Sequence, residues 1–497
     1  MKKLIVLRIS AVLLLCITLV FFTIGASAYE ALSMERIAPE KYMVYPYRSI
    51  TNIGDPFVMY DDASEKYYMY VTGGTYFRCY SSDTMKTWTS EGDSYVVTDK
   101  SFGVKSYWAP EVYKIDNAYY MVYSAMNEGG RHSIGLAKAS TPKGPFTDVY
   151  DHPLFAPDYS VIDASLFFDD DGKVYLFYSK DCSENVVTGM KTSQSFGIEL
   201  KKDLSGTVGT PVLVSTPMFG WESKSGSTRW NEGPFVFKQN GIYYLLFSVN
   251  FYATEHYAVG YATAKSPLGP YEKAKSNPIL VGDGINTAGT GHCALTRSPD
   301  GSEIYIAYHS HNNPLSLEKV NRVPCIDKLV VCEDGTLKVS GHSTTIQPLP
   351  SGASGLYKKN SGISITSGFN TLLGDTEKLT DELLANVAHG NTEAYSFICS
   401  DEKFIEIKYD TPITLDSLWI YGVNSVRLTP RKVYAVINDT YKTATYTFSS
   451  VAALEPAVIG LSNLPSGVKV ENVKLYFEPR DSFTPVCSIS EIITIYK

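Results

Sequence analysis

Residues 161–180 read VIDASLFFDDDGKVYLFYSK, and this stretch indicates how most of the chain folds. An acidic residue, Asp163, stands in front of a short apolar strand, a tight turn follows at Asp171 and Gly172, and the next strand is rich in Tyr, Phe and Val. A strand, a short turn that contains Gly and an aromatic strand together predict a β-hairpin.

The same pattern occurs five times in the sequence. The five copies begin at Asp55, Ala109, Asp163, Glu232 and Gly291, at intervals of roughly 54 to 69 residues. A Pro-Gly turn also recurs, as STPKGPF at 140–146 and as KSPLGPY at 265–271. Turn-separated strands with almost no helical periodicity indicate an all-β protein, and about four strands in each of five repeats predict a five-bladed β-propeller.

The rest of the chain divides into a leader, a linker and a second domain. Residues 1–28 combine basic residues, an apolar run at 9–24 and Ala-Ser-Ala before Tyr29, which predicts a cleaved secretory signal peptide; an uncleaved anchor is the alternative. We expect the propeller domain at 29–345, with residues 29–53 supplying a strand that helps to close the ring. A linker rich in Pro, Gly and Ser at 346–356 and a β-sandwich at 357–497 complete the prediction.

Composition narrows the choice of partner. The formal net charge of −8 argues against nucleic acid. The 37 Tyr residues suit both strands and surfaces that face sugars, because the ring packs while the hydroxyl stays hydrated. We expect a secreted protein whose partner is a polysaccharide or oligosaccharide, with no membrane contact after signal cleavage.

Three of the five repeats begin with a carboxylate: Asp55, Asp163 and Glu232. Repeats arranged around an axis would bring these residues together at one end, although any one carboxylate could simply accept hydrogen bonds from nearby backbone amides. Two carboxyl groups that flank a glycosidic bond can hydrolyse it, one by protonating the leaving oxygen and the other by activating water or attacking carbon. A third negative charge would raise the pKa of the acid and keep it protonated.

Five motifs in this order resemble glycoside hydrolase family 43. They are IGDPF at 53–57, YWAPEV at 107–112, IDASLFFDDDGKVYLFY at 162–178, NEGPF at 231–235 and GTGHCALTRSPDG at 289–301. The resemblance implies a five-bladed propeller that inverts the anomeric centre. It also implies that Asp55 is the general base, that Asp163 tunes the acid and orients the substrate, and that Glu232 is the general acid. In an inverting enzyme the base and the acid lie about 6.5–9.5 Å apart.

Other residues have expected roles around this centre. His292 resembles the family's axial histidine, which implies a structural calcium ion contacted through water, with a core histidine as the alternative. No cofactor is expected for the chemistry. Trp108, Trp230 and Arg229 are candidate substrate-binding residues, although Trp108 could equally pack between blades. Glu111 lies further into its strand, where a structural role is expected.

The C-terminal region more loosely resembles a discoidin-like, galactose-binding-like sandwich, through its strand order and VCSISEIITIY at 486–496. Such a resemblance implies a carbohydrate-binding module, in which Trp419 is expected to lie in the core. The predicted function is a secreted, inverting glycoside hydrolase that removes arabinofuranosyl or xylosyl units from arabinoxylan or arabinan. An endo-arabinanase and a non-catalytic carbohydrate-binding protein are the alternatives.

Overall fold

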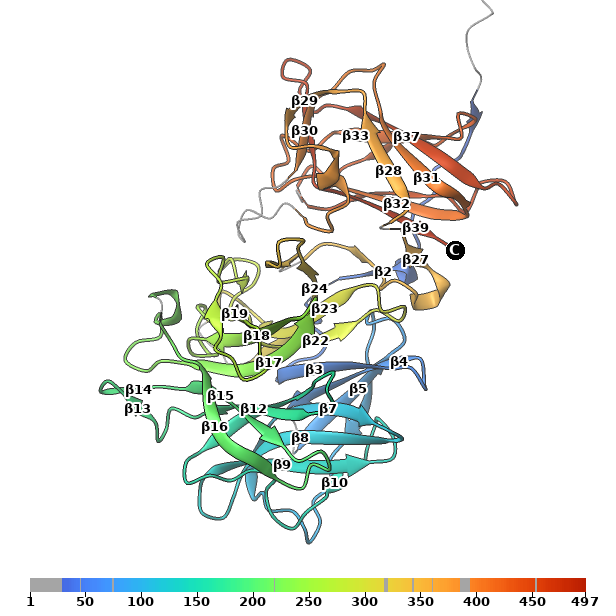
Figure 1. Ribbon diagram of the computed structural model, residues 1–497. Coiled ribbons are helices and arrows are strands. Elements are labelled where there is room, and N and C mark those ends of the chain that lie inside the picture. The colour runs from blue at the N-terminus through green and yellow to red at the C-terminus, as the bar shows by residue number, and fades with distance from the viewer. Residues whose placement is uncertain are drawn as a thin grey trace, which may run out of the picture.

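The computed structural model describes residues 29–44, 46–73, 76–218, 220–316, 321–341, 344–359, 361–384, 394–451 and 454–497. The expected signal peptide, 1–28, lies outside these residues. The described chain forms two β domains stacked end to end, a propeller and a sandwich (Figure 1). Four short 3₁₀ turns accompany them: η1 (Pro39–Lys41), η2 (Gly220–Glu222), η3 (Ala353–Gly355) and η4 (Thr376–Leu379). Nowhere in the described ranges is there a helix with the length and apolar character needed to cross a bilayer.

Five antiparallel sheets form the blades, and each blade is one continuous stretch of chain. Blade one contains β3 (Gly54–Asp61), β4 (Lys66–Thr72), β5 (Phe77–Ser82) and β6 (Thr89–Asp93). Blade two contains β7 (Lys105–Ile115), β8 (Ala118–Met126), β9 (His132–Ala139) and β10 (Thr147–Asp148). Blade three contains β11 (Val161–Phe168), β12 (Val174–Lys180), β15 (Gln194–Leu200) and β16 (Thr207–Ser215), with the small hairpin β13 (Val186–Val187) and β14 (Met190–Lys191) inserted. Blade four contains β17 (Asn231–Gln239), β18 (Ile242–Val249), β19 (Ala258–Ala264), β20 (Glu272–Lys273) and β21 (Leu280–Val281). Blade five contains β22 (Gly291–Arg297), β23 (Ile304–His311), β24 (Arg322–Val331) and β25 (Leu337–Val339).

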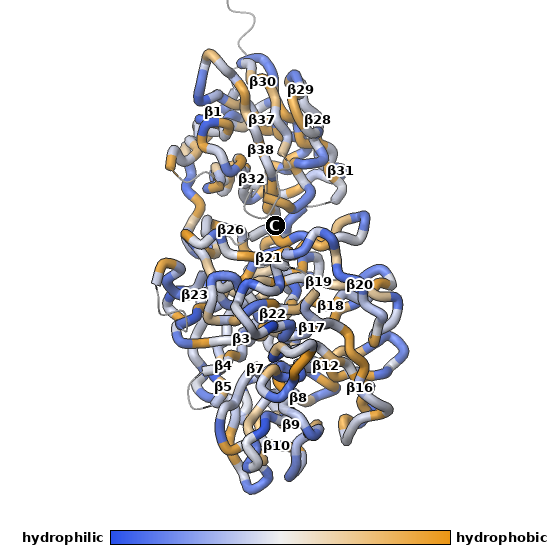
Figure 2. Tube along the Cα trace, turned by 90° about the vertical axis from the view of Figure 1, so that its left-hand side faces the viewer, coloured by the Kyte–Doolittle hydropathy of each residue, from blue (hydrophilic) through white to orange (hydrophobic). Residues whose placement is uncertain are grey.

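Tyrosine rings fill much of the space between blades. Tyr95 and Tyr123 are buried with their ring centroids 5.2 Å apart, and both hydroxyls donate to the buried carboxylate of Asp148 at 2.5 Å. A buried hydroxyl needs such a partner, because leaving it unpaired costs about 1–3 kcal/mol. Hydrophobic and hydrophilic residues alternate along the trace of both domains, as expected for strands with one face in the core (Figure 2).

The innermost strand of every blade contains a β-bulge near its start. The residue at the bulge has a positive φ, between +46° and +58°, and the pairing with the second strand shifts at that point. The five bulge residues are Asp55, Ala109, Asp163, Gly233 and His292. Asp55 and Asp163 lie at the bulge of their strands, whereas Glu232 lies one residue before the bulge of its strand. The three carboxylates therefore do not occupy the same place in the repeat.

The first hairpin of blade three has a longer turn than the sequence predicts. Phe168 pairs with Val174, and the amide of Asp169 donates to the carbonyl of Lys173. Gly172 has a φ of +80°, which glycine adopts without steric cost. The connection is thus a three-residue loop that ends in a left-handed glycine, instead of a two-residue turn.

The N-terminal segment 29–53 contacts both domains, and Tyr47, Ile50 and Ile53 pack against blades one and five. Strand β1 (Glu30–Ala31) pairs in parallel with β34 (Tyr441–Lys442) of the sandwich, and β2 (Tyr42–Met43) pairs with β26 (Gln347–Pro348). The prediction that residues 29–53 supply a blade strand was wrong, because neither β1 nor β2 joins a blade. The sequence does not show this, since both strands pair with segments more than 300 residues away. Blade five therefore meets blade one through side chains and isolated backbone hydrogen bonds.

The sandwich has two main sheets and a smaller one. The first sheet contains β1, β34, β33 (Lys432–Ile437), β37 (Val470–Glu478), β31 (Ile405–Ile413), β28 (Ile363–Ser367) and β35 (Tyr446–Thr447). The second contains β27 (Tyr357–Lys358), β39 (Glu491–Tyr496), β32 (Leu415–Tyr421) and β36 (Ala457–Gly460), and the third β29 (Asn370–Leu373), β30 (Tyr395–Ile398) and β38 (Val486–Ile489). Trp419 is fully buried, so it cannot serve as a surface platform for sugars.

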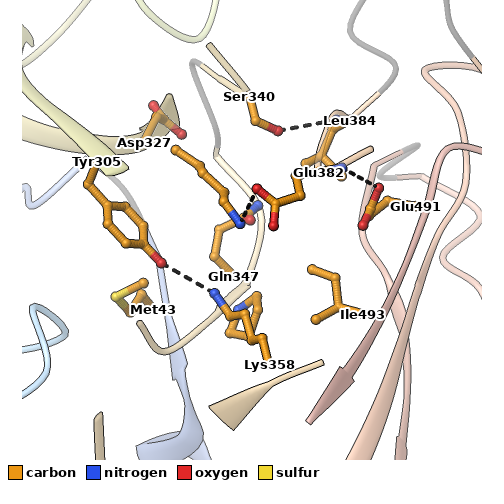
Figure 3. Close-up of a pocket in the computed structure, with 12 residues that line it drawn as sticks. Met43, Tyr305, Asp327, Ser340, Gln347, Lys358, Glu382, Leu384, Glu491 and Ile493 are labelled. Atoms are coloured by element: carbon orange, nitrogen blue, oxygen red, sulfur yellow. Dashed lines mark hydrogen bonds and ion pairs between the residues drawn. The ribbon is translucent and has the colours of Figure 1, made fainter. Parts of the chain in front are cut away.

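Buried charges join the two domains (Figure 3). The carboxylate of Glu303, on blade five, accepts from Lys328 at 2.8 Å and from Lys358 at 2.7 Å. Lys328 also pairs with Glu382, whose backbone amide donates to Glu491 of the sandwich. Four of these residues, Lys328, Lys358, Glu382 and Glu491, line a cavity of about 40 Å³. The segment expected as a linker, 346–356, packs here, with Leu349 and Ala353 buried.

Candidate active site

A cavity of about 360 Å³ lies at the end of the propeller where the innermost strands begin. It is lined by Asp55, Thr72, Trp108, Ile162, Asp163, Asp181, Cys182, Trp230, Glu232, Phe251, Tyr252, Tyr257, His292 and Arg322. The three carboxylates singled out in the sequence are thus brought together, from blades one, three and four. The volume falls within the range of ligand pockets in proteins, about 300–1,000 Å³.

Asp55 is an ionised carboxylate that pairs with the guanidinium of Arg322. Its Oδ1 atom lies 3.1 Å from Nη1 of Arg322 and 3.4 Å from Nδ1 of His292, and its Oδ2 atom accepts from the hydroxyl of Thr72 at 2.7 Å. Burial alone would raise the pKa of Asp55, but His292, Arg322 and these hydrogen bonds outweigh it and hold the pKa well below the usual range. Asp55 is therefore charged at any working pH and can accept a proton from water.

Asp163 accepts a hydrogen bond from the backbone of the strand that carries Glu232. Its Oδ2 atom accepts from the backbone amide of Gly233 and from the hydroxyl of Ser179, both at 3.1 Å. Burial, with a contribution from the charge of Asp55, raises the pKa of Asp163 to about 6. The hydrogen bond to Gly233 fixes the backbone next to Glu232, so Asp163 influences that residue through both position and charge.

Glu232 has the opposite electrostatic environment to Asp55. Burial raises its pKa well above the usual range, and the negative charges of Asp163, Asp181 and Asp55 raise it further. The hydroxyl of Tyr257 donates to its Oε1 atom at 3.3 Å. Glu232 is therefore protonated when Asp55 is ionised, which is the pairing of states that acid–base hydrolysis requires.

The predicted substrate-binding residues differ in their placement. Trp108 is 39% exposed, lines the cavity and stacks on His132 with ring centroids 4.2 Å apart. Trp230 also lines the cavity, with Phe251 at 5.1 Å. Arg229 does not line it, and its guanidinium lies 3.7 Å from the sulfur of Met190 in the β13–β14 hairpin.

Glu111 also stays outside the cavity lining. It hydrogen-bonds with Tyr113 of the same strand, and burial raises its pKa to about 8. A neutral carboxylic acid that is paired with a tyrosine in the interior fits the structural role expected from the sequence.

The surroundings of His292 do not form a protein-built calcium site. Calcium prefers six to eight oxygen ligands. The carboxylate of Asp55, 3.4 Å from His292, is already paired with Arg322. In the ranges that the structure describes, no three His, Cys, Asp or Glu side chains gather in a way that could hold a metal. An ion beside His292 would have to be held mainly through water.

Sequence reasoning missed several cavity residues, among them Arg322, Tyr252 and Asp181. The guanidinium of Arg322 lies over the ring of Tyr252 at 4.6 Å while it pairs with Asp55. Asp181 directly follows β12, and its carboxylate accepts from the backbone amide of Ser183 at 2.8 Å. Tyr252 and Asp181 could have been predicted from the hairpin pattern. In an antiparallel hairpin the second strand ends where the first begins, so residues just after each second strand lie near the carboxylates that begin the first strands.

Comparison with known proteins agrees with this site. The sequence profile of "Glycosyl hydrolases family 43" matches residues 50–337. The chain is 31% identical over 278 residues to a protein of Aspergillus niger named beta-D-galactofuranosidase xynD, which covers 53% of this chain and 74% of that protein. It is 27% identical over 301 residues to an arabinoxylan arabinofuranohydrolase of Paenibacillus polymyxa, covering 54% of this chain but only 44% of the relative.

A solved structure supports the same assignment. A crystal structure of a thermostable family-43 glycoside hydrolase superposes with a TM-score of 0.59 at 40% identity, covering 62% of this chain and 99% of the other. The propeller with its carboxylate-lined cavity is that of a glycoside hydrolase. The chain belongs to glycosyl hydrolase family 43.

Proposed function

We propose that this enzyme hydrolyses glycosidic bonds with inversion, with Asp55 as general base, Glu232 as general acid and Asp163 tuning the acid. The observation that carries this proposal is that Asp55 and Glu232 line one cavity in opposite electrostatic surroundings, which lower the pKa of Asp55 and raise the pKa of Glu232. The acid protonates the leaving oxygen while the base takes a proton from the water that attacks the anomeric carbon. Because the base already carries its charge and the acid its proton, neither group has to change state before the reaction.

The proposed substrates are arabinofuranosyl or xylosyl units of plant cell-wall polysaccharides such as arabinoxylan and arabinan. The name of the Paenibacillus relative supports arabinofuranosyl units, and the name of the Aspergillus relative adds galactofuranosyl units as a second furanose. The sugar would be contacted by Trp108, Trp230 and Arg322. Arg229 lies outside the cavity lining and would not contact the sugar directly. An endo-arabinanase remains the alternative, and membership of the family argues against a binding protein without activity.

The test is hydrolysis of aryl α-L-arabinofuranoside, aryl β-D-xyloside, aryl β-D-galactofuranoside and debranched arabinan by the mature protein. Glu232→Gln is the control. Release from one aryl glycoside that is lost in the control supports an exo-acting enzyme and identifies its sugar. Cleavage of arabinan alone supports the endo-arabinanase. Proton NMR of the first product anomer tests inversion, and retention of configuration would contradict the base assignment.

Glu232→Gln also tests the acid assignment by itself. The variant should lose most activity on glycosides with poor leaving groups but much less on activated aryl glycosides, because a good leaving group needs little protonation. An equal loss on both kinds of substrate would contradict the role of Glu232 as the acid.

Further proposals concern the parts outside the cavity. We propose a secreted protein with a signal peptide at 1–28, a structural calcium ion held mainly through water beside His292, and a discoidin-like sandwich that binds carbohydrate. A calcium-dependent rise in melting temperature that His292→Ala abolishes would support the ion. Retention of the Glu232→Gln protein in a gel that contains arabinoxylan would support polysaccharide binding.

A further inference from the structure

A ring of five hydrogen bonds at corresponding positions joins the blades at the level of the cavity. In four of them, the amide of a bulge residue donates to a hydroxyl at the end of the preceding blade's second strand. The distances are 2.8 Å from Ala109 to Thr72, 2.9 Å from Asp163 to Ser124, 3.1 Å from Gly233 to Ser179 and 2.8 Å from His292 to Ser248. The acceptors occupy the same register position, opposite the residue before the bulge.

The fifth bond closes the ring and differs from the others. The amide of Asp55 donates to Nδ1 of His309 at 3.3 Å, and His309 pairs with Gly291 at the register position that Ser or Thr occupies in the other blades. The bond spans the junction between blades five and one. Around the whole ring, only this acceptor is an imidazole, and the residue it holds is the proposed base.

His309 contacts Asp55 directly and is linked to Glu232 through Tyr257. It is completely buried, and its ring stacks on that of Tyr257 at 5.5 Å and 13°, while the hydroxyl of Tyr257 donates to Glu232. Because Nδ1 accepts from an amide, the ring is neutral and carries its proton on Nε2. Burial and the charge of Arg322 lower the pKa of His309, in agreement with this state.

We propose that His309 is a positioning residue for catalysis: it fixes Asp55 at the closing junction of the propeller and supports the tyrosine that contacts Glu232. This inference rests on the function proposed for Asp55 and Glu232. A backbone at positive φ is costly for any residue except glycine, so the surroundings of Asp55 must hold it there. A displacement of about 1 Å at such a site can cost a factor of about 100 in rate.

The test compares His309→Asn with His309→Leu. The Oδ1 atom of Asn can take the place of Nδ1 as acceptor, whereas Leu has a similar shape without an acceptor. We expect Asn to retain most of the wild-type kcat and Leu to lose about tenfold to hundredfold in kcat, with KM nearly unchanged in both. Equal kcat values for the two variants, whether high or low, would overturn the proposal.

Two controls separate the possible failures. Melting temperatures show whether both variants fold, and if Leu does not, His309→Ser and His309→Ala give the same comparison with the hydroxyl acceptor of the other blades. Asp55→Ala tests the base itself. If Asp55→Ala retains activity, the proposed function fails; if it is inactive while Asn and Leu behave alike, only the role of His309 fails.

Discussion

Replacing Asp163 with Asn should shift the alkaline limb of the pH profile of kcat/KM to lower pH. Asn keeps an oxygen that can accept from Gly233 and Ser179, so the change mainly removes a negative charge. That charge helps to keep the pKa of Glu232 raised. A neighbouring charge typically moves a pKa by about 1–3, and lowering the pKa of the acid by about 1 reduces the rate on the alkaline limb about tenfold.

The pKa of Asp163 sets the pH above which the substitution changes kcat/KM. Since this pKa is raised to about 6, Asp163 carries its charge only above that pH. Wild type and variant should therefore have similar kcat/KM below about pH 6 and diverge increasingly above it. The assay is a pH profile on a substrate with a poor leaving group, for which protonation by Glu232 limits the rate.

Ser179→Ala provides the matched control, because it disturbs the same contact without removing a charge. It should lower activity at all pH values without moving the alkaline limb. An Asp163→Asn profile with an unmoved alkaline limb would refute the electrostatic role, and the same shift in both variants would assign the effect to geometry.

Other substitutions test the rest of the molecule. Asp181→Asn should shift the same limb in the same direction by a smaller amount, since Asp163 acts more strongly than Asp181 on the pKa of Glu232; a pH profile measures this. Trp108→Ala should raise KM about tenfold through lost stacking, while Arg229→Ala, outside the cavity lining, should leave KM near wild type. Glu303→Ala should cost about 3–5 kcal/mol in chemical unfolding, because it leaves the buried ammonium group of Lys358 without its ion-pair partner. The lysines depress the pKa of Glu303 despite its burial, so this contribution should be present above about pH 4.3 and be lost as the pH falls below that value.

The repeat and its carboxylates could be predicted because both are local features. Each hairpin is encoded within about twenty residues, and Asp55 and Asp163 mark the start of their strands. The position of Glu232 one residue earlier could not be predicted, because it depends on a bulge whose residue is Asp in two blades and Gly233 in a third. A positive φ suits Gly, and Asp adopts it more readily than most residues, so the two look different in sequence while they share one conformation.

Residues whose roles depend on distant pairing could not be found in the same way. Arg322 lies 267 positions from Asp55, and β1 pairs with a strand more than 400 residues away. His309 is followed two residues later by another histidine, and nothing local distinguishes them. Only the register of β22 with β23 gives His309 the position of a serine or threonine in the other blades.

The junction at which blade five meets blade one holds the proposed base in place. Each blade is one continuous stretch, so no shared strand ties blade five to blade one. The ion pair of Arg322 with Asp55 and the bond from Asp55 to His309 cross this junction, together with a bond from the amide of Ile53 to the carbonyl of Arg322. A Cβ on Gly54 would lie 2.2 Å from the guanidinium, so glycine is required there for the pair to form. The charge that prepares Asp55 to act as a base therefore also holds the ring closed, and a substitution of Arg322 should weaken both.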